Sequence, residues 1–97
     1  MKITMVKKIL ADGSPCKKCG EVLERLEQSG HIHRIDRIVE AYESDPLSEG
    51  MQIATMLNVE KAPFFVVEKP GNAPVVYTIY FKLVKDVLEK EAAEETR

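Results

Sequence analysis

Two cysteines are the residues of this chain best suited to chemistry. They are the only cysteines among 97 residues, and both fall in the unit Cys16-Lys17-Lys18-Cys19. A disulfide between them would close too short a loop to restrict the unfolded chain, so it would contribute little stability. A disulfide-stapled secreted scaffold would normally carry more cysteines. The pair is therefore better explained by thiol–disulfide chemistry than by a structural role.

The position of the pair along the chain suggests different roles for its two members. Turn-forming residues 11–15 precede it, and a helical pattern follows to about Gln28. The unpaired N–H groups at a helix start carry partial positive charge and stabilise a thiolate. We expect Cys16 to be the exposed nucleophile and Cys19, one turn further in, to be the shielded resolving cysteine. The two lysines between them should favour the thiolate.

Other interpretations of the cysteines stay open at this level. With His31 and His33, Cys16 and Cys19 make four possible zinc ligands, although zinc-finger histidines are normally three to five residues apart. The same cysteines would also suit an iron–sulfur module. A non-catalytic interaction domain, or an inert pair, is a further alternative, but the adjacent lysines argue against burial of both sulfurs. We expect neither a bound metal nor a cofactor.

A proline marks a second candidate feature. Pro63 follows Ala62 and directly precedes the strand-like run 64–68, after a helical pattern that ends at about Asn58. Proline cannot donate a hydrogen bond to a sheet, so the start of a strand is one of the few positions it can occupy. An ordinary strand-entry proline would produce the same pattern.

The remaining patterns predict the elements that position these residues. Residues 32–42 also match a helical period, but the glycine stop at Gly30 favours a strand. Asp45-Pro46 suits a helix start, with Leu47, Met51, Ala54 and Leu57 as its buried stripe. Charged residues 91–97 should fray. In chain order, the prediction is a strand at 3–10, a helix to 28, a strand at 32–40, a helix from 46 to 58, strands at 64–68 and 75–80, and a last helix from about residue 81. Phe81, Val84 and Leu88 are expected on one side of that last helix.

The order β-α-β-α-β-β-α predicts an α/β domain spanning residues 1–97. A βαβ unit joins parallel strands through a right-handed crossover, whereas the final hairpin adds antiparallel neighbours. The expected product is a four-stranded mixed sheet with helices on both faces. We find no internal repeat or linker in the sequence.

The chain resembles the thioredoxin/glutaredoxin superfamily from end to end. The resemblance rests on the helix-start Cys-x-x-Cys, the element order and the Ala62-Pro63 strand entry. It implies a thioredoxin-like fold with Pro63 in cis beside Cys16. It also implies that the Ala62 backbone offers hydrogen bonds to an extended substrate segment, a form of strand addition. Lys17 and Lys18 would belong to the same substrate-facing surface.

The same resemblance implies a dithiol–disulfide oxidoreductase. Its partners would be a protein disulfide or a sulfur-metabolising reductase as electron acceptor, and a protein reductase or small thiol as electron donor. Two departures bear on the subfamily. Pro15 stands where thioredoxins carry tryptophan, and residues 78–82 lack the glycine pair with which glutaredoxins hold glutathione. We therefore expect no dedicated glutathione groove.

Bulk composition excludes several other classes. The net charge is −2 and there is no tryptophan, so the sequence offers neither a basic face nor a stacking platform for nucleic acid. No apolar run approaches the roughly 18 residues of a membrane span. Residues 1–8 lack the apolar block of a secretory signal. We expect a cytoplasmic monomer.

Overall fold

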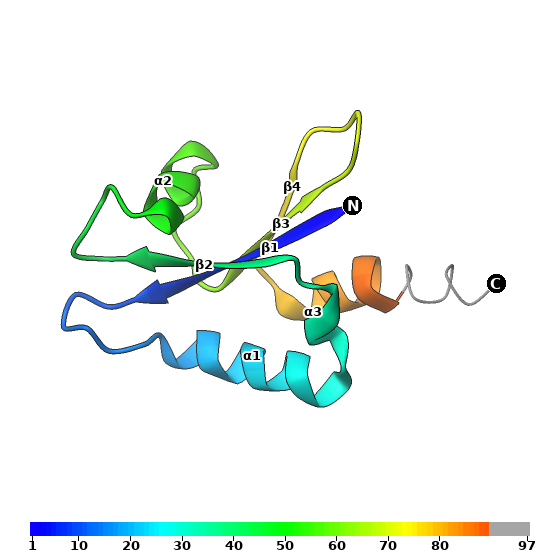
Figure 1. The fold of residues 1–97 in the computed structure, drawn as a ribbon, viewed down its shortest axis with the longest axis horizontal. Helices are drawn as coiled ribbons and strands as arrows, with labels where there is room; N and C mark the ends of the chain where they lie inside the picture. Colours follow the sequence, from blue (N-terminus) through cyan, green and yellow to red (C-terminus); the bar gives the residue numbers. More distant parts are fainter. Residues whose placement is uncertain (90–97) are drawn as a thin grey trace.

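The structure, a computed structural model, describes residues 1–89 and is organised around strand β1 (Lys2–Ile9). β1 pairs in parallel with β2 (Arg37–Tyr42) and antiparallel with β3 (Phe64–Glu68). β3 in turn pairs antiparallel with β4 (Val75–Tyr77), which gives the strand order β2-β1-β3-β4. The predicted four-stranded mixed sheet is confirmed, and β1 lies at its centre (Figure 1).

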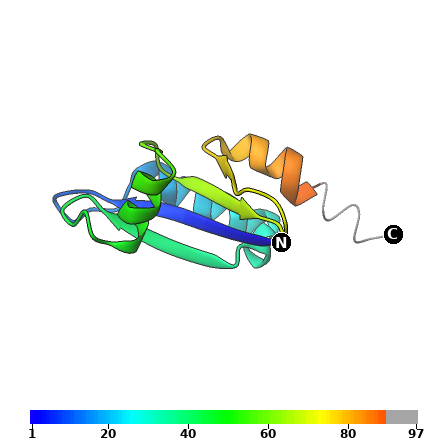
Figure 2. The ribbon, with the colours of Figure 1, turned by 90° about the horizontal axis from the view of Figure 1, so that it is seen from above.

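Helices cover both faces of this sheet, as predicted. α1 (Lys17–Ser29) and α3 (Tyr80–Leu83), with the π-helical turn η2 (Val84–Leu88) that continues it, lie on one face, and α2 (Glu49–Met56) lies on the other (Figures 1 and 2). Side chains that alternate along β1 and β3 serve the two faces in turn. The core under α1 and α3 contains Ile3, Met5, Val22, Leu26, Phe65, Val67, Leu83, Val87 and Leu88. The core under α2 contains Val6, Ala41, Phe64 and Val66.

The segment predicted as a strand from residue 32 is a strand only from Arg37. Residues His31–Arg34 form a short 3₁₀ helix, η1, in which the N–H of Ile35 donates to the carbonyl of Ile32. Ile32 and Ile35 pack against the core below α1, so their three-residue spacing reflects the 3₁₀ period and not a strand. The predicted start of the strand was wrong because isoleucines at this spacing suit a strand as well as a 3₁₀ helix.

The helix predicted from Pro46 begins three residues later, at Glu49. Asp45 accepts a hydrogen bond from the N–H of Leu47 through its side chain, which holds this segment in a turn. Leu47 is 77% exposed, so its place in the predicted buried stripe was wrong. Gly50 instead allows α2 to approach β2 closely, because a Cβ at this position would come within 2.5–2.6 Å of the Ala41 backbone. The helix therefore packs directly on β2.

The last elements also differ from the prediction. β4 ends at Tyr77 and not at residue 80. Phe81 is 71% exposed, so it does not share the buried side of the terminal helix. The buried residues on that side are Leu83, Val87 and Leu88, and the partly buried Val84 packs against the same core. The widened π turn over 84–88 brings Val87 and Leu88 inward together. The predicted frayed end, residues 91–97, lies outside the described residues. Within residues 1–89, we find no helix of the length and apolar character that crossing a membrane requires.

Candidate active site

Cys16 occupies the N-cap position of α1. Its backbone is extended, with φ −64° and ψ 123°, and its Sγ accepts a hydrogen bond from the backbone N–H of Cys19 at 3.2 Å. Its own N–H donates to the carbonyl of Lys8 at 3.1 Å. A sulfur in the place normally taken by a capping oxygen satisfies one of the free N–H groups of the helix start.

Cys19 lies one turn further along α1 and is buried, with 2% of its surface exposed. Its Sγ accepts a hydrogen bond from the backbone N–H of Lys8 at 3.5 Å. Burial raises the pKa of the Cys19 thiol to about 11, and its hydrogen bond with Cys16 adds to the increase. Cys16 is half-buried, so the two cysteines have the expected order of exposure. Neither forms a disulfide.

Lys8 is the residue of the sheet that holds both cysteines, and the sequence did not single it out. β1 pairs with β3 from Lys2↔Glu68 to Val6↔Phe64, so Lys8 lies two residues beyond the last paired position of β1. The N–H and carbonyl of alternate residues point to the same neighbouring strand. Lys8 therefore directs its backbone toward the place where β3 has already ended. The start of α1 fills that place with Cys16 and Cys19.

The segment that leads into β3 contains the predicted proline. The Ala62–Pro63 peptide bond is cis, as the resemblance implied, and Pro63 is buried directly before β3. Ala62 is half-buried. Among the residues that the structure describes, its backbone N–H and carbonyl have no hydrogen-bond partner. Just before β3, the chain thus leaves one backbone donor and one backbone acceptor available.

A tight loop leads from β1 to Cys16. The N–H of Leu10 donates to the carbonyl of Ser14 at 2.8 Å, and Ile9 bridges Pro15. The Ser14 hydroxyl and N–H both donate to Asp12 Oδ1, and these bonds lower the pKa of the Asp12 carboxyl. Asp12 therefore stays charged and is engaged within its own loop.

The two lysines between the cysteines carry charges that no carboxylate neutralises within residues 1–89. Lys17 and Lys18 are exposed, and within residues 1–89 neither forms an ion pair. By contrast, the ammonium of Lys8 lies 3.7 Å from Glu43. The two flanking positive charges are therefore free to act on an incoming group.

The predicted alternative of a zinc site from Cys16, Cys19, His31 and His33 is wrong for a single chain. The cysteines lie at the amino end of the 13-residue α1, whereas both histidines follow its carboxyl end. At 1.5 Å per residue the two pairs are about 20 Å apart. In the described part of the chain, no three cysteine, histidine or carboxylate side chains gather as metal ligands would.

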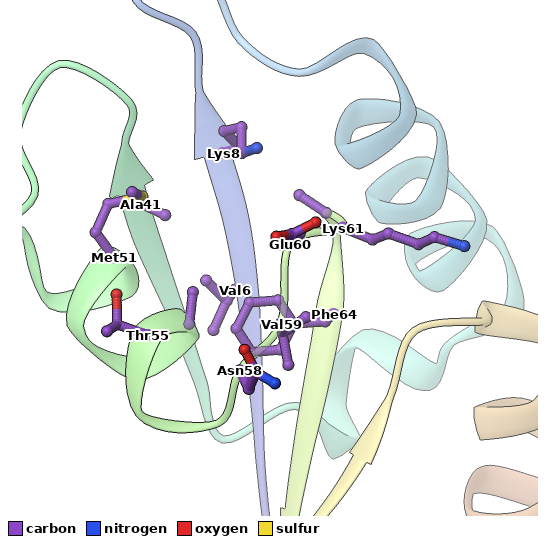
Figure 3. Close-up of a pocket in the computed structure, with 12 residues that line it drawn as sticks. Val6, Lys8, Ala41, Met51, Thr55, Asn58, Val59, Glu60, Lys61 and Phe64 are labelled. Atoms are coloured by element: carbon purple, nitrogen blue, oxygen red, sulfur yellow. The ribbon is translucent and has the colours of Figure 1, made fainter.

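A cavity of about 380 Å³ lies between α2 and the sheet, beside the segment 58–62 that leads into β3 (Figure 3). Lys8 lies at one end and Asn58 at the other, with Glu60 and Lys61 along one side (Figure 3). Ala62 also lines it. No sequence pattern predicted a cavity, because Met51 and Ala54 suggested only a packed stripe. Its apolar surface is formed by Val6, Ala41, Met51, Ala54, Val59 and Phe64.

Comparison of the sequence with known proteins gives no assignment: no family model matches the chain, and no curated protein matches it.

Proposed function

We propose that this protein is a dithiol–disulfide oxidoreductase with a thioredoxin-like fold. The observation that carries the proposal is the pairing of unlike thiols at the start of α1. Cys16 is accessible and receives an N–H hydrogen bond, whereas Cys19 is buried with a pKa of about 11. Thiol–disulfide exchange requires one cysteine that attacks as a thiolate and a second that stays protonated until the mixed disulfide has formed.

The proposed reaction moves two electrons from the cysteines to a substrate disulfide. The Cys16 thiolate attacks one substrate sulfur, forms a mixed disulfide and releases the other substrate sulfur as a thiolate, which takes up a proton. Cys19 then loses its proton and attacks Cys16 Sγ. This step forms the Cys16–Cys19 disulfide and releases the second substrate thiol. Each step exchanges one S–S bond for another, so no cofactor is needed.

Ala62 supports the recognition half of the proposal. Its unpaired backbone groups lie next to Pro63. Ala62 also lines the same cavity as Lys8, whose backbone contacts both cysteines. An extended substrate segment that pairs with Ala62 would bring its disulfide to Cys16 by strand addition. Lys17 and Lys18 would stabilise the thiolate forms of the reacting sulfurs.

The fold supports the assignment to the thioredoxin class. Its element order, the mixed sheet with order β2-β1-β3-β4 and the cis proline before β3 are the features that the resemblance implies. Protein disulfides are accordingly proposed as electron acceptors and a protein reductase or small thiol as the donor.

The direct test is the stoichiometric reaction of the reduced protein with a peptide disulfide. We expect each protein molecule to release two peptide thiols and to end with a Cys16–Cys19 disulfide. The matched control is the variant with Cys16→Ser and Cys19→Ser. Peptide thiols released by the wild-type protein no faster than by this control would overturn the proposal and favour a non-catalytic interaction domain.

A further inference from the structure

The cavity between α2 and the sheet has no role in the exchange steps, yet it borders the site where they occur. It shares Lys8 and Ala62 with the cysteine site. Lys8 holds Cys19 through its backbone, while its side chain lines the cavity (Figure 3). A substrate segment at Ala62 would therefore lie at the mouth of this cavity.

Strand geometry determines what such a segment would present. Successive side chains of an extended chain point to opposite faces of a sheet. If the substrate cysteine points toward Cys16 on the α1 face, the residue next to it points toward the α2 face. The cavity opens on that face, since Val6, Ala41 and Phe64 belong to the core under α2 and also line the cavity.

The chemistry of the lining selects the kind of side chain. The walls next to the sheet are apolar. Of the charged residues, Lys8 lies at one end, Glu60 and Lys61 lie along one side, and the Lys61 side chain extends away from the apolar residues (Figure 3). A charged side chain would lose its hydration inside without a matched partner, whereas an apolar one would be stabilised by burial. The volume, near the lower limit of about 300 Å³ for small-ligand sites, accommodates one large side chain.

We propose that this cavity is a specificity pocket for a large apolar residue directly next to the reacting cysteine of a protein disulfide substrate. The inference rests on the proposed function and names the substrate class of that same site.

The test uses short peptides whose cysteine carries a chromogenic thiol as a mixed disulfide. A neighbouring residue, placed before or after the cysteine, is Ala, Leu, Phe or Lys. With the reduced wild-type protein, Leu or Phe on one side should raise the second-order rate constant about tenfold over Ala, and Lys should not raise it.

Two variants change the size of the cavity in opposite directions. Ala54→Leu fills it and should reduce the Leu-to-Ala rate ratio to about one. Met51→Ala enlarges it and should shift the preference from Leu toward Phe. The control is Met56→Leu on the same helix, because Met56 is 80% exposed and lies outside the cavity. This variant should keep the wild-type ratios.

The possible failures are distinguishable. Equal rates for all neighbouring residues, or an unchanged preference in both cavity variants, would overturn the pocket while leaving the exchange reaction intact. Absence of exchange with every peptide would overturn the proposed function itself. If Ala54→Leu does not fold, the wild-type peptide series and Met51→Ala still decide the question.

Discussion

The two ends of α1 use their polar groups in opposite ways. Beyond its carboxyl end, Asp36 Oδ2 accepts the N–H of Ile3 at 2.7 Å, and the Ile3 carbonyl accepts the N–H of Asp36 at 2.8 Å. Arg34 adds a bond from Nη1 to the carbonyl of Leu88 at 3.2 Å. At the amino end, Cys16 is partly exposed, and its Sγ accepts a single hydrogen bond, from the N–H of Cys19, within the described part of the chain.

Under the proposed function, the carboxyl end of α1 has a structural role and the amino end carries out the exchange reaction. The network at Asp36 joins the first strand, the η1 segment and the end of the terminal helix, so its hydrogen bonds are used up in the fold. The amino end is held by contacts of the Lys8 backbone with both cysteines, and these contacts leave the Cys16 sulfur partly exposed. Substitutions at the amino end should therefore lower the exchange rate, whereas substitutions at the carboxyl end should lower the free energy of unfolding.

Loss of the Cys16 sulfur should have the largest effect on exchange. Cys16→Ser keeps a capping atom at the start of α1 but removes the attacking thiolate, so the rate of peptide disulfide reduction should fall at least about a thousandfold. The measurement is the rate of peptide thiol release by the reduced protein. The variant with His31→Ala and His33→Ala, at the other end of α1, should keep the wild-type rate. A comparable loss in the histidine variant would remove the distinction between the two ends.

Asp36 should affect stability and not exchange. Asp36→Ala leaves the N–H of Ile3 without its acceptor and should lower the free energy of unfolding by about 1–3 kcal/mol. Asp36→Asn keeps an acceptor oxygen and should lose less. Urea unfolding gives the stability, and the exchange rate per folded molecule should not change. A slower exchange rate in folded Asp36→Ala would show that the ends are coupled.

The buried Cys19 thiol should make stability depend on alkaline pH. Burial raises its pKa from 9.0 to about 11. Between these values the folded protein keeps a proton that the unfolded chain has lost, so stability should fall as pH rises through this window. The contribution is fully present below pH 9 and is lost as the pH rises through about 11.

Urea unfolding of the reduced protein below pH 9 and near pH 11 tests this linkage. Cys19→Ala should show a smaller loss of stability across the same window, because other titrating groups remain. Equal losses in the two proteins would mean that burial does not keep the proton on Cys19.

The smallest effect concerns the lysines between the cysteines. Replacing both in Lys17→Gln, Lys18→Gln removes exposed charge beside the helix start and should slow exchange by roughly two- to fivefold at low salt. Added salt should reduce the difference in exchange rate between the wild-type protein and this variant, since these charges are accessible to solvent. The variant with Lys82→Gln and Lys85→Gln on the terminal helix serves as control. A control as slow as the test variant would assign the effect to net charge alone.

Much of the sheet could be predicted because its strands carry local signals. The β-branched runs of β1 and β3 and the cysteine spacing needed no tertiary information. The strand from Arg37 was obscured because Ile32 and Ile35 fit several periods, and only packing on the core selects a 3₁₀ turn. The start of α2 was misplaced because Asp45 caps a turn as readily as a helix.

The site was predicted in part for the same reason. Cys16, Cys19 and Pro63 lie in recognisable local patterns, whereas Lys8 acts through its backbone, and backbone contacts leave no mark on side-chain type. The exclusion of the histidines required the length and direction of α1. The cavity depends on how α2 sits on β2 through Gly50, which no local pattern reveals.

Identifying the cysteine that joins the substrate tests the central claim most directly. The reduced Cys19→Ser variant is mixed with a peptide disulfide, quenched by alkylation and mapped by mass spectrometry. Because a serine hydroxyl in place of the Cys19 thiol cannot resolve the intermediate, we expect a stable mixed disulfide between the peptide and Cys16. The wild-type protein should instead accumulate the Cys16–Cys19 disulfide. Absence of a peptide adduct on Cys16, or wild-type protein in which the peptide stays attached to Cys19, would contradict the account.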